Sequence, residues 1–412
     1  MSSSPSLGQV SPELSLYHLL DPDVLADPYG LYARLREEAP VHWDPYLHAW
    51  VVTRYSDVVE VLHRFDAART PSPERLEALG MSELSPIAAV MVRQMLFLDQ
   101  PDHGRVRRLA SVAFTPRRVA RLREHIREIA ERLIDEMAAE PSFDVMTGLA
   151  NPLPAIVTAE LLGVPTADHE LLKSWSQDFA EMLGNFQHNP GRARKTLQSV
   201  EEMTTYFHAA VRREAADPTE GLINALASAE VDGDRLSEEE VVANVIVTMV
   251  GGQETTTNLI GNGLLTLLRQ PDELERLRAE PDLMPSAVEE LLRYESPSQH
   301  TARLAPQGAV LGGYEIPEGA AVIAVMGAGN RDPERFPDPD RLDLAREDNR
   351  HLAFGWASHF CFGAPLARLE GVLAFEALLA RFPRLSLAPG HEITWRPNLG
   401  LRGLSELRAT AA

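Results

Sequence analysis

The segment from Ser237 to Arg269 constrains the fold more strongly than any other part of the chain. Ser237 is followed three residues later by Glu240, and this capping box predicts the start of a helix. Apolar residues recur from there to Arg269, where Pro271 ends the pattern. A helix of about thirty residues is much longer than the average in globular proteins. We therefore expect a central, buried helix in a large domain.

Most of the remaining chain is also predicted to be helical, from its apolar spacing and its Pro and Gly punctuation. We expect further helices at 27–39, 55–62, 102–113, 116–139, 150–162, 167–184, 191–215, 219–229, 271–279, 285–295 and 366–382. We expect strands in a hairpin at 41–53 and at 301–304, 309–311, 314–316 and 321–325. Residues 65–98 are predicted to be irregular, 330–349 a polar meander, and 1–12 a flexible tail. The fold class is mainly α with a smaller β region, in a single domain over 1–412.

Composition limits the compartment and the partners. The single cysteine, Cys361, excludes intrachain disulfides and suits a reducing compartment, so we expect a cytoplasmic monomer. No uncharged apolar run approaches the ~20 residues that a membrane span requires. The net charge of −21 argues against nucleic acid as a partner.

One segment of this acidic chain is strongly basic. Residues 103–127 contain eight arginines but one acid, Glu124. The pattern fits a solvated helix face, a docking face for an acidic partner, or a clamp for an anionic cofactor.

Cys361 occupies an unusual position for a lone cysteine, which is more often a small buried hydrophobe. It lies between a turn at Phe354–Gly355 and a predicted helix from Leu366. Backbone N–H groups at a helix start, together with the helix dipole, favour an anionic sulfur. The surroundings therefore admit a metal ligand or a nucleophile beside the structural interpretation.

The middle of the long helix contains residues that form helices poorly. The run Gly251-Gly252-Gln253-Glu254-Thr255, with two more threonines after it, costs on the order of 3 kcal/mol relative to alanine. Glycines without Cβ atoms leave a groove in which a flat or small ligand can approach the backbone. Glu254 and Thr255 beside that groove would form a proton relay, although a tight helix crossing explains the glycines equally well.

Two spacings add weaker signals. Glu290 and Arg293 share a helix face at i, i+3, as common surface pairs do. His103 and Arg107 share a face at i, i+4. Together with Arg303 and with His359 of the cysteine loop, His103 and Arg107 could donate hydrogen bonds to a dianionic cofactor.

Together these segments resemble the cytochrome P450 superfamily, specifically its soluble bacterial haem-thiolate monooxygenases. The family's haem loop, Phe-Gly-x-Gly-x-His/Arg-x-Cys-x-Gly, stands here as Phe354 to Gly363. Its Ala/Gly-Gly-x-Asp/Glu-Thr helix motif stands as Gly251 to Thr255, and its Glu-x-x-Arg motif as Glu290 to Arg293. The arginine that completes the last motif matches Arg341. The resemblance runs from about Asp27 to the C-terminus.

The resemblance implies a P450 fold around haem b (iron protoporphyrin IX), with Cys361 as the proximal ligand of the iron and Phe354 beside its sulfur. It implies that Glu254 and Thr255 deliver protons to bound O2. The implied cofactor-binding residues are His103, Arg107, Gly251, Arg303, Phe354, His359, Cys361 and Gly363. The implied substrate-pocket residues are Val247, Val250 and Gln299, and the segments 65–98, 176–192 and 398–401 match further regions that line the pocket. Glu290, Arg293 and Arg341 would form a structural triad.

The expected reaction is the insertion of one oxygen atom from O2 into an apolar organic substrate, by hydroxylation or a related oxidation, in secondary metabolism. Electrons would come from NAD(P)H through a ferredoxin reductase and a separate ferredoxin, which would dock on the basic segment. A peroxide-driven haem-thiolate enzyme, a non-enzymatic haem-thiolate sensor and a cysteine-nucleophile enzyme are the alternatives. Ala357 replaces the usual loop glycine and would be strained at positive φ. Phe362 is bulkier than the family's usual residue there.

Overall fold

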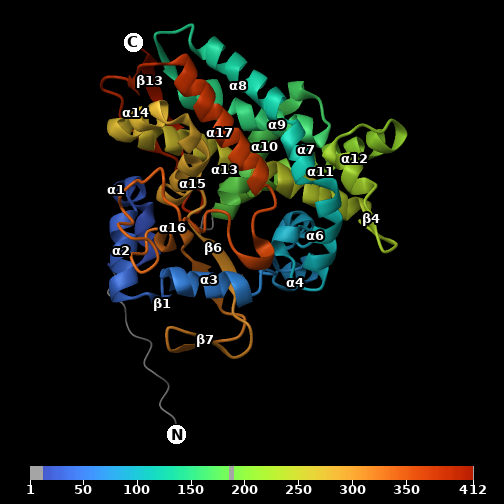
Figure 1. The fold of residues 1–412 in the computed structure, drawn as a ribbon. Helices are drawn as coiled ribbons and strands as arrows, with labels where there is room; N and C mark the ends of the chain where they lie inside the picture. The colour runs from blue at the N-terminus through green and yellow to red at the C-terminus, as the bar shows by residue number, and fades with distance from the viewer. Residues whose placement is uncertain (1–12, 185–189, 412) are drawn as a thin grey trace. The chain divides into compact units, whose positions relative to one another are not determined.

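The structure is a computed structural model that describes residues 13–184 and 190–411. The chain forms two compact units, which are coloured by residue number in Figure 1. Unit 1 comprises residues 1–67, 258–364 and 383–412, and unit 2 comprises residues 68–257 and 365–382. The predicted tail at 1–12 lies outside the described residues, as does part of the 176–192 segment. The single-domain organisation stays a prediction.

Unit 1 contains a four-stranded sheet with the order β1-β2-β9-β6. Strands β1 and β2 form the predicted hairpin, and β2 pairs with β9 in parallel. Strand β6 pairs with β9 in the antiparallel direction, with Arg303 opposite Val322. The strands are β1 (Val41–Asp44), β2 (Ala49–Val52), β6 (Thr301–Leu304) and β9 (Ala321–Ala324).

Apolar side chains on this sheet pack against helix α3 (Tyr55–Arg64), which lies beside the sheet in Figure 1. Trp50, Val52 and Val322 from the strands join Val58 and Leu62 from the helix. β-branched and aromatic residues suit a half-buried pleated surface, which explains why these short segments form strands. The cluster also includes Leu352, so the start of the cysteine loop is anchored in this core.

The other helices of unit 1 surround this core. They are η1 (Leu16–Leu20), α1 (Pro22–Ala26), α2 (Tyr29–Glu38), α14 (Pro271–Ala279), η6 (Pro281–Leu283), α15 (Met284–Tyr294), α16 (Met326–Gly329) and η7 (Ala357–His359). Its remaining strands are β7 (Ala309–Leu311), β8 (Tyr314–Ile316), β10 (Leu385–Leu387), β11 (Thr394–Trp395), β12 (Leu404–Glu406) and β13 (Arg408–Ala411). Three antiparallel pairs form among them: β7 with β8, β10 with β13, and β11 with β12.

Unit 2 is almost entirely helical. Its elements are α4 (Pro73–Ala78), η2 (Ser82–Leu84), α5 (Ser85–Met91), η3 (Met95–Phe97), α6 (Asp102–Ala113), α7 (Pro116–Arg121), α8 (Arg123–Met137), β3 (Ser142–Asp144), η4 (Met146–Ala150), α9 (Pro152–Leu162), η5 (Thr166–Asp168), α10 (His169–Gly184), α11 (Pro190–Ala216), α12 (Leu222–Ala227), β4 (Glu230–Val231) and β5 (Asp234–Arg235). Two long helices complete it: α13 (Glu238–Arg269), which continues into unit 1 from Asn258, and α17 (Ala364–Arg381), whose first residue belongs to unit 1.

The long central helix starts as the sequence predicts. The Ser237 N–H donates to Glu240 Oε2 at 2.9 Å, and the Glu240 N–H donates to Ser237 Oγ at 3.2 Å. This reciprocal pair is the predicted capping box, and α13 then continues for 32 residues. The helix is mostly buried, and its buried side chains include polar ones such as Asn244, Asn258 and Asn262 beside the apolar ones.

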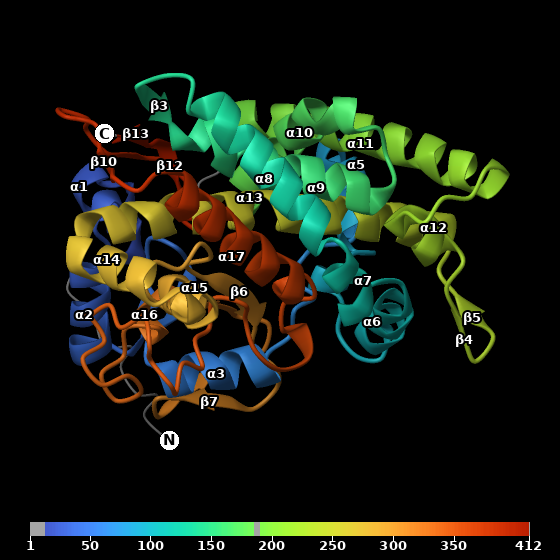
Figure 2. The same ribbon diagram turned by 45° about the horizontal axis from the view of Figure 1, so that its top comes forward.

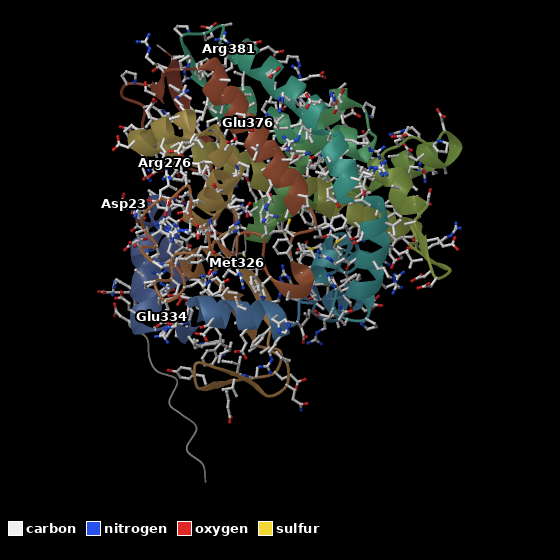
Figure 3. All side chains as sticks on the ribbon, in the orientation of Figure 1. Asp23, Arg276, Met326, Glu334, Glu376 and Arg381 are labelled. Atoms are coloured by element: carbon white, nitrogen blue, oxygen red, sulfur yellow. The ribbon has the colours of Figure 1, made fainter. Side chains whose placement is uncertain are left out.

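Helix α17, which follows the cysteine loop, lies along α8 in both views (Figures 1 and 2). Two ion pairs join these helices: Arg127 with Glu376 at 3.8 Å and Arg381 with Asp135 at 2.9 Å. Figure 3 shows Glu376 and Arg381 on successive parts of α17. Both pairs are substantially exposed, so each contributes little to stability.

The mainly α fold class with small sheets is confirmed, and the differences are local. Residues 65–98, predicted to be irregular, contain the short helices α4 and α5. The predicted helix at 116–139 is divided at Leu122, and a hairpin of β4 and β5 follows α12. Helix α16 and strand β3 were also missed, because elements of three or four residues carry too little periodicity.

Candidate functional site

Cys361 lies in a loop that closes on itself within unit 1. The Cys361 N–H donates to the carbonyl of Phe354 at 2.7 Å, and the Gly355 N–H donates to the carbonyl of Leu352 at 2.8 Å. The first turn of α17 begins three residues after the cysteine, at Ala364. The thiol is half-buried and forms no disulfide. The loop therefore presents one sulfur atom beside a helix start, which is the setting that favours a thiolate.

Ala357 has a positive φ, the backbone conformation in which we expect an alanine to be strained. Its φ is +54°, a left-handed value that normally favours glycine, and Gly355 has φ +72°. For alanine this conformation costs about 1–2 kcal/mol. The expected strain at Ala357 is confirmed, and η7 begins at this residue without disruption of the Cys361 hydrogen bond.

A buried network of ion pairs in unit 1 is linked to the cysteine loop by hydrogen bonds. Arg293 forms a two-point pair with Glu290, with Nε to Oε2 at 2.8 Å and Nη2 to Oε1 at 2.7 Å, and neither side chain is exposed. Arg346 donates its Nε to both Glu290 oxygens at 3.2 Å. The prediction that Arg341 completes this triad was wrong. The Arg341 residue is exposed, and its backbone carbonyl accepts from Arg293 and Arg346.

Asn330 connects this network to the cysteine loop. Its carbonyl accepts from Arg293 Nη1 at 2.9 Å, and its Oδ1 accepts from the Leu352 N–H at 2.6 Å. His351 adds a second anchor, because its Nδ1 accepts from the Ala353 N–H while its Nε2 lies 3.2 Å from Glu289 Oε2. Sequence reasoning missed Arg346, Asn330 and His351, since single polar residues of a meander carry no local signal.

The two glycines of α13 serve different purposes. A Cβ at Gly252 would lie 3.3 Å from Thr158 Oγ1, so this glycine permits close packing against α9. A Cβ at Gly251 would meet no atom within 4 Å, and the residue is exposed although it sits in the middle of a buried helix. The interpretation as a tight helix crossing therefore applies to Gly252, and the interpretation as an open groove applies to Gly251.

The predicted acid and alcohol lie beside this open point. Thr255 is one turn beyond Gly251, and its Oγ1 donates to the Gly251 carbonyl at 2.7 Å. Glu254 is 6% exposed, so its carboxyl group is turned into the protein. Val250 is buried and Val247 is half-buried on the preceding turn. The helix thus carries an exposed notch with a hydroxyl group at its edge.

The four residues predicted to hold a dianionic cofactor are spread over three elements. In unit 2, His103 is 2% exposed and Arg107 is half-buried, one turn apart on α6. In unit 1, Arg303 on β6 is 3% exposed, and its Nη1 donates to the Ala302 carbonyl at 3.1 Å. His359 is half-buried at the end of η7, two residues before Cys361. Arginine and histidine side chains donate hydrogen bonds to carboxylates, so these residue types suit a cofactor that carries carboxylates.

Gln299 belongs to a pair of loops that are joined by hydrogen bonds. Its N–H donates to the Gly400 carbonyl, and its own carbonyl accepts from Gly327, both at 2.9 Å. Its side-chain Nε2 donates to the Ser296 carbonyl at 2.7 Å. Burial lowers the pKa of the neighbouring His300 to about 4, although a hydrogen bond with the backbone of Leu399 acts in the opposite direction. Residues 296–300 and 398–401 are therefore held together by neutral groups.

These observations together fit haem. Unit 1 contains one half-buried cysteine sulfur on a preformed loop and the buried Arg303, and unit 2 contains an open backbone notch at Gly251 and the buried His103. Gly363, beside the cysteine, likewise has no atom within 4 Å of a built Cβ. A mainly helical protein with these features belongs to the haem-thiolate class.

The chain belongs to the cytochrome P450 family, whose family model matches residues 49–399. It is 38% identical to the polyketide biosynthesis cytochrome P450 PksS of Bacillus subtilis (strain 168), over 96% of this chain and 98% of that protein. It is 40% identical to the cytochrome P450 monooxygenase PikC of Streptomyces venezuelae, over 94% of this chain and 92% of that protein. The resemblance found in the sequence is confirmed.

Solved structures agree with this assignment. P450BioI, in complex with an acyl carrier protein ligated to hexadec-9Z-enoic acid, has a TM-score of 0.88 and 36% identity, covering 95% of this chain and 99% of that one. Myxobacterial CYP267B1 in complex with myristic acid has a TM-score of 0.87 and 36% identity, covering 96% of this chain and 99% of that one. The P450 fold predicted from the sequence is confirmed.

The protein is thus an oxidoreductase of the cytochrome P450 monooxygenase type, a family that binds haem through a cysteine thiolate. Over residues 13–184 and 190–411, the structure contains no helix with both the length and the apolar character required to cross a membrane.

Proposed function

We propose that this protein is a haem b monooxygenase that inserts one oxygen atom of O2 into a C–H bond of an apolar organic substrate, or carries out a related oxidation. The observation that carries the proposal is the notch on α13. Open space at Gly251 is followed by the Thr255 hydroxyl one turn later, and the residue before Thr255 is the buried acid Glu254. A sensor or carrier of haem would not require an acid and an alcohol at adjacent positions of this helix.

In this proposal Cys361 binds the haem iron as a thiolate, and Phe354, 8% exposed, packs beside the sulfur. When bound, haem supplies the capacity to bind and activate O2. The propionates are held by His103, Arg107, Arg303 and His359. The absence of a Cβ at Gly251 and Gly363 allows the ring to approach the backbone closely.

Thr255 and Glu254 manage protons in the proposed reaction. The Thr255 hydroxyl now donates to the Gly251 carbonyl, which keeps it oriented at the edge of the notch. It can rotate and donate toward the notch at the cost of that one local hydrogen bond. Glu254, adjacent in sequence, supplies the carboxyl group from which the threonine is recharged with a proton.

The residues that we propose to contact the substrate are Val247 and Val250 on α13 in unit 2, and Gln299 with residues 398–401 in unit 1. Two of these side chains are aliphatic, which suits an apolar scaffold. The relatives are named for polyketide biosynthesis, biotin biosynthesis and the hydroxylation of 6-deoxyerythronolide B. We infer a carbon-rich biosynthetic intermediate of this general kind.

Electrons are proposed to come from a ferredoxin, reduced by NAD(P)H through its reductase, that docks on the basic segment 103–127. Arg105 pairs with Glu240 and Asp234, and Arg127 pairs with Glu376, so these two are already engaged. The arginines that remain exposed are Arg108, Arg117, Arg121 and Arg123. Clustered exposed cations suit an acidic partner and favour rapid association.

The test measures how much of the NAD(P)H oxidised by Thr255→Ala ends as released peroxide. A ligand that shifts the ferric spin state is chosen from a screen of fatty acids, steroids and macrolides. Peroxide release per NAD(P)H oxidised is then measured with ferredoxin and reductase. We expect a severalfold rise over wild type. Thr266→Ala is the matched control, because the Thr266 hydroxyl donates to the carbonyl four residues back, as Thr255 does.

Unchanged peroxide release in Thr255→Ala would contradict the assigned role. Turnover by added peroxide at the rate supported by ferredoxin would favour a peroxide-driven enzyme instead.

A further inference from the structure

His351 directly precedes the turn that contains Phe354. Its side chain is 2% exposed, and its Nδ1 accepts a hydrogen bond from the Ala353 N–H at 3.2 Å. The peptide group that supplies this N–H is also bonded at its other end, because the Leu352 carbonyl accepts from the Gly355 N–H at 2.8 Å. Both polar groups of one peptide are therefore satisfied, and the turn is held in one conformation.

These contacts define which ring nitrogen of His351 carries the proton. A backbone N–H can only donate, so Nδ1 is the acceptor and the neutral ring carries its proton on Nε2. Nε2 lies 3.2 Å from Glu289 Oε2, and this carboxylate therefore accepts from it. A carboxylate bonded to one ring nitrogen makes the other nitrogen a better acceptor. Glu289 on α15 thus strengthens the hydrogen bond between His351 and Ala353.

The turn also contacts the backbone of the cysteine. The Phe354 carbonyl accepts from the Cys361 N–H at 2.7 Å. The rings of Phe354 and His351 lie against each other, with 5.7 Å between their centroids and 45° between their planes. A displacement of the turn would therefore move the carbonyl that binds the Cys361 backbone. It would also move the Phe354 ring, which in the proposed function packs beside the sulfur.

The loop has a separate anchor that does not reach Phe354. Asn330 Oδ1 accepts from the Leu352 N–H at 2.6 Å, which fixes the start of the turn. His351 bonds the next N–H along the chain and packs against the Phe354 ring. It therefore controls the part of the turn that faces the cysteine, whereas Asn330 controls the part that joins the buried network.

We propose that His351 is a positioning residue that keeps the reduction potential of the haem iron low, through the turn that contains Phe354. The potential of a thiolate-ligated haem depends on hydrogen bonds near the sulfur and on its exposure to water. One electron taken from a reductant converts ferric to ferrous iron and adds a negative charge, which water at the sulfur stabilises. Loss of the His351 contacts loosens the turn, admits water and raises the potential. This inference rests on the proposed haem monooxygenase function, because it requires Cys361 to ligate the iron.

The experiment measures this potential in the holoenzyme without substrate or ferredoxin, by spectroelectrochemical titration with dithionite and mediator dyes. His351→Leu removes both hydrogen bonds of the ring. At a fixed potential we expect the ratio of ferrous to ferric protein to rise about three- to tenfold, the size expected for the loss of one hydrogen bond. That change of ratio corresponds to an upward shift of about 30–60 mV for a one-electron couple.

His351→Asn separates the hydrogen bond to Ala353 from the rest of the ring. An asparagine oxygen accepts from the N–H two residues later, which is the bond that Nδ1 makes here. This variant should therefore return the potential most of the way to the wild-type value. Glu289→Gln keeps an acceptor for Nε2 without its charge, and it should raise the potential by less than His351→Leu does.

His42→Leu is the matched control. His42 is also a buried histidine of unit 1, and its Nδ1 lies 2.8 Å from the Ala39 carbonyl. Its replacement removes a buried ring and a hydrogen bond to the backbone, as His351→Leu does. We expect His42→Leu to leave the reduction potential unchanged, whatever its effect on the melting temperature.

Two results would overturn the inference. An unchanged potential in His351→Leu, even with a lower melting temperature, assigns His351 to the stability of the loop alone. Equal rises in His351→Leu and His351→Asn exclude the hydrogen bond to Ala353 as the cause. If His351→Leu fails to bind haem, His351→Met and Glu289→Gln replace it, and unchanged potentials in both have the same meaning. A wild type without the CO spectrum of a thiolate-ligated haem fails the proposed function itself, whereas a wild type with that spectrum and variants without effect fail this inference alone.

Discussion

Replacement of Arg346 by methionine tests which arginine completes the buried network beneath the cysteine loop. Glu290 has no exposed surface and accepts from Arg293, Arg346, the Asp343 N–H and Asn349 Nδ2. Removing one partner of a buried ion pair costs about 3–5 kcal/mol. Because Arg293 still contacts both carboxylate oxygens, we expect the lower end, about 3 kcal/mol, for Arg346→Met.

Arg341→Met is the matched control, since that residue is exposed and only its backbone carbonyl takes part in the network. We expect it to change the free energy of unfolding by less than about 0.5 kcal/mol. Urea unfolding of the holoenzyme, followed by circular dichroism, measures both variants. With an m value of about 3 kcal/mol/M, Arg346→Met should lower the midpoint by about 1 M. Equal losses in the two variants would refute the assignment of Arg346.

Three further outcomes follow from individual residues. Ala357→Gly should raise the free energy of unfolding by about 1 kcal/mol, because φ is +54° at this position, and a lower midpoint would argue against strain there. Burial raises the pKa of Glu370 well above its usual range, so the folded protein keeps a proton that the unfolded chain releases above about pH 4.5. The free energy of unfolding of the wild type therefore falls as pH rises, by up to about 1.4 kcal/mol per pH unit. The gain in this free energy from Glu370→Gln should grow from pH 5 to pH 8, and a gain that stays constant with pH would contradict this. In stopped-flow measurements, Arg108→Glu and Arg117→Glu should slow reduction by ferredoxin in a salt-dependent way. Arg212→Glu, at an exposed position of α11, should not slow it. A reduction rate that none of the three variants changes would exclude the proposed docking face.

The parts of the fold that sequence predicted well are those with strong local signals. The capping box at Ser237 and the long apolar pattern after it gave α13 within a residue of its observed bounds. Turn residues and alternation gave the hairpin of β1 and β2. The segment 65–98 was misjudged, because its helices are only six and seven residues long and depend on packing for their stability.

The residues of the candidate site also differ in whether they carry a local sequence signal. Motif residues such as Cys361 and Thr255 could be selected from their spacing, and Ala357 could be marked as a strained position. Arg346 could not, because its pairing with Glu290 spans 56 residues and lies in a polar meander where several arginines occur.

The central claim is that the Cys361 sulfur ligates haem iron as a thiolate. The most direct measurement is the absorption spectrum of the reduced protein with CO bound. The account predicts the red-shifted Soret band of a thiolate-ligated haem in wild type, and its loss in Cys361→His with haem retained. A wild-type spectrum of the ordinary histidine-ligated kind would contradict the assignment of Cys361 and the reaction proposed from it.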